Sequence, residues 1–310
     1  MYDGIVNVYK EAGYTSHDVV ARLRGVYGQK KVGHTGTLDP LAEGVLIVVL
    51  GRATRLADLI ITKKKKYTAE MLLGITTDTD DITGNVISEA ESGETDRLFS
   101  NKAMLEGLIK DVFSGFMGKS KQIPPRYSAI KINGKKLYEY AREGIEVELT
   151  PRPIEIYSLI LKGINESEHK VLFEIEASKG TYVRSLIRDI GERIGCGATM
   201  SGLVRDEING IYLSDALKIS DLEKLKGEDR LAESVLPMDK LLENYPEVHV
   251  RKEAVRFLSN GNRLSQGSFT EQDEELVMQA EFFRVYMDDE IKALYTYDKE
   301  KNNYKVFKML

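Results

Sequence analysis

The stretch from Gly33 to Leu50 (GHTGTLDPLAEGVLIVVL) constrains the fold of this chain more than any other part of the sequence. Its first half carries Gly33, Gly36 and Gly44, and glycine permits close or left-handed turns that other residues resist. Its second half, Val45 to Leu50, is an apolar run with the length and content of a buried strand. The stretch therefore predicts a shaped loop anchored on a rigid strand, where proteins often place functional side chains.

Asp39 lies at the centre of this loop. Pro40 directly follows it, and a proline favours extended backbone angles in the residue before it. A short carboxylate held in this way can act as a nucleophile, as a base or as the partner of a cation. The alternative is an ordinary turn, because aspartate often bonds its own backbone in loops.

Together with the Gly51–Arg55 segment (GRATR) that follows, GHTGTLDPLAEGVL closely resembles the central motif of the TruB family of tRNA pseudouridine synthases. The resemblance implies an enzyme that isomerises uridine to pseudouridine at position 55, in the T arm of tRNA. It implies that Asp39 is the nucleophile, that the target base is flipped out of its stack, and that no cofactor or metal takes part. Attack on the sugar and attack on the base ring both stay open.

Two further family segments supply partners for Asp39. Tyr67 begins a segment (YTAEMLLG) with the alternation of a strand, and it matches the family tyrosine that stacks on the target base and takes part in proton removal. Arg184 lies in the first turn of a predicted helix (SKGTYVRSLIRDIGERIG), and by resemblance it pairs with Asp39. The alternatives are an ordinary strand aromatic for Tyr67 and a surface arginine bonded to Asp189 or Glu192 for Arg184.

The resemblance also assigns residues that bind the substrate. It implies that His34 holds the flipped RNA conformation and that Leu203 packs against the target base. Lys10 keeps the lysine of a family Lys-Pro-Gly turn that reads Lys-Glu-Ala-Gly here, and Val204 replaces the middle arginine of a family Leu-Arg-Arg segment. His34 could instead be a turn residue bonded to local backbone, and leucines in strands are mostly core.

A segment of about residues 119–150 is predicted to grip RNA. From Lys119 to Glu143 there are seven basic residues and two acidic ones, interleaved with tyrosines around an Asn133-Gly134 hairpin turn. Such a surface suits RNA backbone and unpaired bases, and the matching family element closes over the tRNA. We expect Arg126, Lys135 and Lys136 to bind it. A plain hairpin and helix with half-buried tyrosines is the alternative.

The rest of the charge is unevenly distributed as well. The net charge is −5, and residues 78 to 96 carry seven acidic side chains and no basic one. The segment from Thr76 to Arg97 is predicted to be an exposed connection. The lysine run from Lys63 to Lys66 could hold phosphates next to the site, or it could be a solvated loop.

Composition excludes several classes of protein. A chain of 310 residues with 42% hydrophobic and 30% charged content suits a soluble globular protein with a large domain and a small one. The single cysteine, Cys196, excludes an internal disulfide and a cysteine-based zinc cluster, and the four histidines lack metal-ligand spacing. There is no apolar run near the ~20 residues of a membrane helix. The first residues lack the pattern of a signal peptide. We expect a cytoplasmic monomer that binds the T stem-loop of tRNA, without a membrane or metal partner.

The predicted fold is α+β, a mixed and largely antiparallel sheet flanked by helices, which is the pseudouridine synthase fold. Residues 1–245 are predicted to form the catalytic domain. Residues 246–310 are predicted to form a small β domain of the RNA-binding PUA type that must dock on its neighbour. Three alternatives stay open: a guide-RNA-dependent synthase of the dyskerin type, a non-catalytic tRNA-binding or folding protein, and an aspartate-based glycosidase. The last usually needs two carboxylates, and only Glu43 lies near Asp39.

Overall fold

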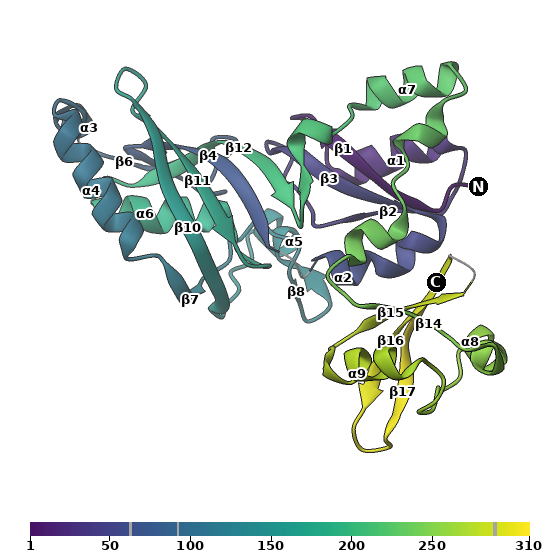
Figure 1. Cartoon of the computed structure of the whole chain (residues 1–310). Coiled ribbons are helices and arrows are strands. Elements are labelled where there is room, and N and C mark those ends of the chain that lie inside the picture. The colour runs from purple at the N-terminus through teal and green to yellow at the C-terminus, as the bar shows by residue number, and fades with distance from the viewer. Residues whose placement is uncertain (62–63, 92, 288–289) are drawn as a thin grey trace.

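The computed structural model describes residues 1–61, 64–91, 93–287 and 290–310. The described residues form one large mixed sheet flanked by helices and a second, smaller C-terminal sheet, which confirms the predicted α+β fold (Figure 1). The large sheet has the strand order β1-β3-β12-β4-β11-β10-β7, with β2 added beside β3 and β13 beside β12. Its neighbouring strands pair antiparallel, except that β3 and β12 are parallel.

The large domain contains strands and helices in mixed order along the chain. The strands of the large sheet are β1 (Gly4–Lys10), β2 (Val32–Thr35), β3 (Glu43–Leu50), β4 (Lys65–Leu73), β7 (Gly118–Gln122), β10 (Arg152–Asn165), β11 (Lys170–Ala177), β12 (Ala198–Ile208) and β13 (Ile211–Tyr212). Two separate hairpins are β5 (Ile75–Thr77) with β6 (Val86–Glu89), and β8 (Lys131–Ile132) with β9 (Lys135–Lys136). The α-helices are α1 (Ser16–Tyr27), α2 (Ala57–Ile61), α3 (Glu94–Phe99), α4 (Lys102–Ser114), α5 (Leu137–Arg142), α6 (Val183–Ile194) and α7 (Ile219–Gly227), and the 3₁₀ turns are η1 (Gly51–Leu56), η2 (Leu213–Asp215), η3 (Leu231–Ser234) and η4 (Met238–Leu242).

Strand β3 is apolar from Val45 to Leu50 because both of its faces are covered there. Leu46 and Val48 lie in the core cluster that includes residues of α1 and α7. Val45 and Ile47 alternate with them and belong to a cluster on the other face, which includes residues of η1 and of the C-terminal sheet. A strand buried on both faces loses the usual alternation of apolar and polar residues. The predicted buried strand is therefore confirmed.

The parallel contact between β3 and β12 joins the two halves of the large sheet. Gly44 lies opposite Arg205, with φ at 101°, and a Cβ atom there would lie 2.4 Å from the Arg205 carbonyl oxygen. Only glycine accepts both this backbone angle and this close approach. The contact brings the loop before β3 beside β12 and β4, while α4 and α6 pack on the half of the sheet built from β4, β10, β11 and β12.

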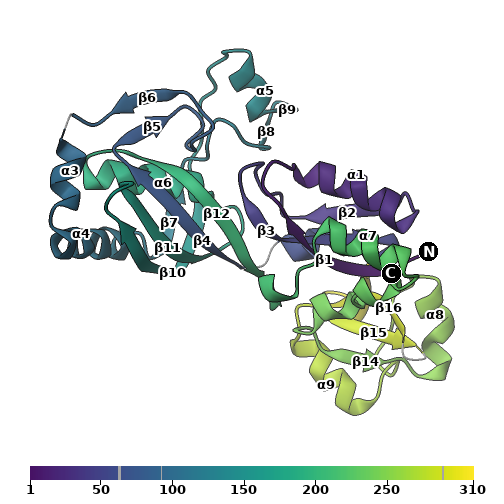
Figure 2. The ribbon, with the colours of Figure 1, turned by 90° about the horizontal axis from the view of Figure 1, so that it is seen from above.

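The segment from Thr76 to Arg97 is only in part the exposed connection that its polarity predicted. Strand β6 is exposed, as expected, but the segment also contains β5 and the start of α3, and the side chains of Thr77 and Asp81 are buried. Thr77 bonds the Asp81 carbonyl oxygen through its hydroxyl group at 2.7 Å. The prediction was wrong for these two residues because their polar side chains bond within the fold instead of to water. Figure 2 shows the β5–β6 hairpin beside the protruding β8, β9 and α5.

The C-terminal part of the chain forms its own lobe with its own core (Figure 1). Its elements are β14 (Glu247–His249), η5 (Lys252–Ala254), α8 (Val255–Ser259), α9 (Glu271–Gln279), β15 (Phe283–Met287), β16 (Glu290–Asp298) and β17 (Asn303–Met309). As expected for a small domain, it docks on the large one: Tyr286 and Leu294 share a core cluster with Ile47 of β3. Arg52 also pairs with Glu290 at 2.6 Å. Its kinship to the PUA type stays a prediction.

Candidate active site

Backbone and side-chain hydrogen bonds hold the loop that carries Asp39, between β2 and β3. The Ser16 hydroxyl group, in the first turn of α1, accepts from the Leu38 backbone N–H at 3.0 Å. The Gly13 N–H donates to the Pro40 carbonyl oxygen at 2.9 Å, and the Ala42 N–H donates to that of Asp39 at 3.1 Å. The side chain of Asp39 is 36% exposed, so a fixed loop presents its carboxylate to solvent.

Arg184 of α6 lies against Asp39, with Nε 2.8 Å from the Asp39 Oδ2 atom. The N–H bond does not align with the line joining the two atoms, so the contact is an ion pair without a well-formed hydrogen bond. The other guanidinium nitrogens donate to the carbonyl oxygens of Thr79, at 2.8 Å, and Tyr127, at 3.0 Å. Arg184 is buried and therefore is not the surface arginine of the alternative interpretation.

Two acidic residues that the sequence analysis left in a solvent-exposed connection complete this network. Asp81 is buried, with Oδ2 3.7 Å from Arg184 Nη1, and Asp80 pairs with Arg188 at 3.0 Å. Burial raises the pKa of the Asp80 carboxyl group, while Arg188 and Arg184 oppose that rise. A signal was present: Arg184 and Arg188 are four residues apart, so both lie on one helix face that needs acidic partners. Asp189, offered as a partner of Arg184, bonds Arg188 instead, at 2.8 Å.

Tyr67 and Leu203 lie next to the Asp39 loop, on the adjacent strands β4 and β12. Both side chains are largely buried, and both belong to the core cluster that contains Leu38 and Ala42 of that loop. Tyr67 lies opposite Arg205 in the sheet, and the Arg205 guanidinium interacts electrostatically with its phenol. The structure thus brings Asp39, Arg184, Tyr67 and Leu203 to one region. Arg205, which the sequence analysis did not single out, lies there as well.

Lys10 lies beneath the Asp39 loop with a fully buried side chain. Its ammonium group donates to the carbonyl oxygens of Ala42, at 2.5 Å, of Glu11, at 3.2 Å, and of Pro40, at 3.3 Å. Burial lowers its pKa to about 8, against smaller opposing effects of Asp39 and Glu43. An ammonium group has three N–H donors, and all three have partners in the protein. Lys10 therefore supports the loop in this conformation and does not face a substrate.

His34 lies on β2, where it pairs with Val48 of β3, and so it is not the turn residue of the alternative interpretation. Its ring packs edge-to-face on that of His17, with centroids 5.2 Å apart. Burial, followed by the charges of His17 and Arg205, lowers the pKa of His34 to about 4. The imidazole is therefore neutral at neutral pH. Among the described residues, its buried Nδ1 atom has no hydrogen-bond partner.

The predicted RNA-gripping segment projects its basic residues around the β8–β9 hairpin. The expected turn is confirmed, with φ positive at both Asn133 and Gly134. Lys135 pairs with Glu143, and the Lys136 ammonium group lies 5.3 Å from the centre of the Tyr138 ring. Arg126 precedes the hairpin and pairs with Glu146 at 3.5 Å.

The lysine run before Tyr67 is only partly solvated. Lys64 pairs with Glu176 at 3.6 Å, and Lys66 pairs with Glu174 at 3.8 Å. Lys65 is buried, and burial lowers its pKa to about 8. Lys63 lies outside the described residues.

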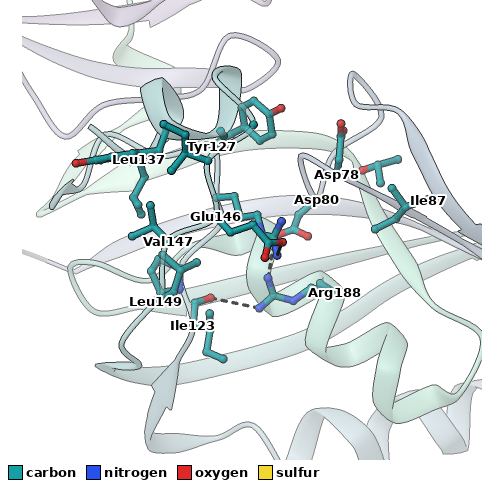
Figure 3. A pocket seen from close by; sticks show the side chains of 17 residues that line it. Asp78, Asp80, Ile87, Ile123, Tyr127, Leu137, Glu146, Val147, Leu149 and Arg188 are labelled. Atoms are coloured by element: carbon teal, nitrogen blue, oxygen red, sulfur yellow. Dashed lines mark hydrogen bonds and ion pairs between the residues drawn. The ribbon is translucent and has the colours of Figure 1, made fainter. Parts of the chain in front are cut away.

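A pocket of about 720 Å³ separates the RNA-gripping segment from the β5–β6 hairpin. Figure 3 shows Arg188 between Asp80 and the carbonyl oxygen of Ile123 at its floor, with Tyr127 and Val147 on its walls. Its lining is Thr77, Asp78, Asp80, Ile87, Ile123, Pro124, Arg126, Tyr127, Leu137, Tyr140, Ala141, Gly144, Ile145, Glu146, Val147, Leu149 and Arg188. The pocket adjoins Asp39 through Arg184, which bonds the Tyr127 carbonyl oxygen. A substrate larger than one nucleotide could therefore extend from Asp39 towards it.

The described residues include neither a cluster of His, Cys, Asp and Glu that could hold a metal ion nor a helix long and apolar enough to cross a membrane. The arrangement of Asp39, Arg184 and Tyr67 places a carboxylate, a paired cation and a phenol close together. These are groups for covalent and acid–base chemistry.

Comparisons with known proteins agree with the resemblance of the motifs. A family model described as TruB family pseudouridylate synthase (N terminal domain) matches residues 24–183, and one described as tRNA pseudouridylate synthase B C-terminal domain matches residues 184–243. The chain is 43% identical to the tRNA pseudouridine synthase B of Lachnoclostridium phytofermentans and 38% identical to that of Ligilactobacillus salivarius, in each case over 99% of both chains.

The fold of this chain is also similar to that of a solved structure. The chain resembles a protein in the crystal structure of a Cbf5–Nop10–Gar1 complex, with a TM-score of 0.72 and 26% identity, over 99% of this chain and 84% of that one. The family matches cover most of the large domain, and the named relatives match nearly the whole length. The chain therefore belongs to the TruB family of pseudouridylate synthases and is an isomerase.

Proposed function

We propose that this enzyme converts the uridine at position 55 in the T arm of tRNA to pseudouridine. The relatives that match nearly its whole length are named tRNA pseudouridine synthase B, which supports tRNA as the substrate. The observation that carries the mechanism is the ion pair of Asp39 and Arg184 at 2.8 Å, on a loop that presents the carboxylate to solvent. An ion pair keeps the carboxylate oriented, which a nucleophile requires.

In the proposed reaction the target uridine leaves its stack and enters the site beside Asp39. Asp39 attacks as the carboxylate, and the bond between C1′ and N1 of the base breaks. The base rotates, C5 bonds to C1′, and the bond to Asp39 breaks, which restores the carboxylate. The C5 proton is lost to a base, and N1 takes up a proton. Tyr67 is adjacent to the loop and can stack on the uracil and take part in that proton transfer. Each step uses side chains of the chain itself and needs no cofactor or metal.

The RNA-gripping segment of about residues 119–150 supplies the proposed hold on the T stem-loop. Its basic side chains include Arg126, Lys135 and Lys136, and its tyrosines lie among them. His34 is neutral at neutral pH, so its proposed contact with the RNA is a packing or hydrogen-bonding contact and not an ion pair. Leu203 is proposed to pack on the flipped base, and residues 246–310 are proposed to form a PUA-like RNA-binding domain.

The test uses an unmodified tRNA transcript tritiated at uridine C5, because forming the C5–C1′ bond releases that label to water. We expect the wild type to release label equivalent to one uridine per tRNA, and a transcript with cytidine at position 55 to release none. Asp39→Asn should release no label. Full release from the cytidine transcript would overturn the assignment of position 55 as the target. Undiminished release by Asp39→Asn would overturn the assignment of Asp39 as the nucleophile.

A second candidate, a guide-RNA-dependent synthase, is favoured by the likeness to a protein from a Cbf5–Nop10–Gar1 complex. The same transcript distinguishes the two. Label release by the chain alone, without added RNA or protein, supports the stand-alone enzyme. No release alone, followed by release when a guide RNA with a complementary target is added, supports the second candidate.

A further inference from the structure

The largest side chain among the fully buried residues belongs to a charged residue, Arg205 of β12. Its Nε atom donates to the Val45 carbonyl oxygen at 2.7 Å, and its Nη2 atom donates to that of Gly36 at 2.8 Å. These two carbonyl groups lie on either side of Asp39 in the sequence. One guanidinium therefore bridges the two ends of the loop that carries the nucleophile.

The same guanidinium also contacts the second proposed catalytic side chain. Arg205 and Tyr67 lie directly opposite each other on β12 and β4, and the guanidinium interacts electrostatically with the Tyr67 phenol. A planar guanidinium can span several acceptors in a fixed geometry, which a lysine ammonium group cannot do. We infer that Arg205 is a positioning residue that fixes the Tyr67 phenol relative to the Asp39 loop for the proposed isomerisation.

The electrostatic surroundings support this assignment over that of a mere structural bridge. Burial lowers the pKa of the Arg205 guanidinium, while Tyr67 and Asp39 oppose that shift. Lys10, His34 and Lys65 also interact electrostatically with Arg205. A position close to other basic groups disfavours a further cation, and the hydrogen bonds of the guanidinium to the Asp39 loop offset that cost.

The inference rests on the proposed function, and the experiment is a double-mutant cycle under single-turnover conditions on the tritiated transcript. Arg205→Met keeps the approximate size and removes the charge, and Tyr67→Phe removes the hydroxyl group that Arg205 touches. We expect each single change to lower the rate by about 100-fold or more, the magnitude typical of losing one donor in an active site. The double variant should be little slower than either one, because residues that act through each other are not additive.

Affinity for tRNA should change by less than about threefold in Arg205→Met, because a buried side chain cannot meet the RNA directly. Arg205→Lys is a second variant that keeps the charge but not the planar fork, and it should stay well below the wild-type rate. Val171→Ala, a core change on β11, is a control for lost stability and should react at the wild-type rate once saturating enzyme is folded.

Three results would overturn the inference while the proposed function survives. They are wild-type rates in Arg205→Met or Arg205→Lys, a wild-type rate in Tyr67→Phe, and a double variant whose loss is the product of the two single losses. If Arg205→Met fails to fold, Arg205→Lys replaces it in the cycle with Tyr67→Phe. A double variant whose loss of rate is the product of the two single losses would then overturn the inference. Failure of the wild type to release label at all would instead reject the proposed function.

Discussion

Arg184 lies between two carboxylates, with Nε 2.8 Å from Asp39 Oδ2 and Nη1 3.7 Å from Asp81 Oδ2. Asp81 is buried, whereas the side chain of Asp39 is 36% exposed. The buried carboxylate shares the charge of the guanidinium, so Asp39 does not hold it alone. A nucleophile must be oriented by its partner and must also be able to leave it, and a shared partner suits both needs.

Arg184→Lys should lower the single-turnover rate by about 100-fold or more, because one ammonium group cannot reach Asp39, the Thr79 carbonyl and the Tyr127 carbonyl together. Affinity for tRNA should stay near that of the wild type, since the side chain is buried. Label release and filter binding measure the two quantities. Arg193→Lys, at the exposed end of the same helix, is the matched control. Equal rates in Arg184→Lys and Arg193→Lys would refute the role of the planar Arg184 guanidinium.

Asp81→Asn should slow the reaction about tenfold, because Arg184 would then pair more tightly with Asp39. It should also lower the free energy of unfolding by about 1–3 kcal/mol, since Asp81 accepts bonds from the Thr79 hydroxyl and the Thr83 N–H in a buried position. Urea denaturation measures the free energy of unfolding, and label release measures the rate. Asp78→Asn is the control, because Asp78 caps the same turn through Asn85. The interpretation fails if Asp78→Asn slows the reaction as much.

Lys10 should make stability depend on pH between about 8 and 10.5. Its pKa is lowered by burial to about 8 in the folded chain and is 10.5 without that burial. In that window the unfolded chain binds the proton and the folded chain does not, so the stability of the wild type relative to Lys10→Met should rise with pH. Below about pH 8 both states hold the proton, and the difference should be flat. Urea denaturation from pH 7 to 10.5 measures it, and a difference that falls with pH would contradict the prediction.

Lys135→Glu combined with Lys136→Glu should weaken binding to tRNA and reduce the slope of log affinity against log salt by about 1–2. The reason is the loss of two half-buried cations of the β8–β9 hairpin that are proposed to contact the phosphate backbone. The control is Lys102→Glu with Lys110→Glu, which changes charge equally on α4. Identical slopes of log affinity against log salt for the two double variants would show that the β8–β9 hairpin is not part of the RNA interface.

Local features of this fold could be predicted from sequence, because each depends on residues close together in the chain. Thr15 caps α1 through a reciprocal bond with Asp18, two residues only three positions apart. The Val45–Leu50 run forms a buried strand, and Asn133-Gly134 forms the hairpin turn. In each case backbone preference and apolar periodicity point to the same structure.

Contacts between distant residues could not be predicted in this way. Arg205 reaches Gly36 across 169 positions of sequence, and nothing local to either residue indicates the partner. The burial of Asp81 depends on an arginine 103 positions later (184 − 81), and so its acidic segment looked solvated. For Lys10, the resemblance to the family indicated a lysine at this position but not where its side chain points. A lysine beside a loop can point into the fold or out of it, and this one points into it.

The way the Asp39 loop is held has a consequence for which sequence changes it can tolerate. Arg205 and Lys10 grip it through the carbonyl groups of Gly36, Val45, Pro40 and Ala42, and a carbonyl group is the same in every residue. Substitution of exposed side chains in the loop therefore leaves its anchors in place. Deletion of one residue does not, because it shifts the chain by about 3.3–3.6 Å, more than the distance that separates Asp39 from Arg184. Drift in this enzyme should accordingly accumulate as substitutions in the loop and never as changes in its length.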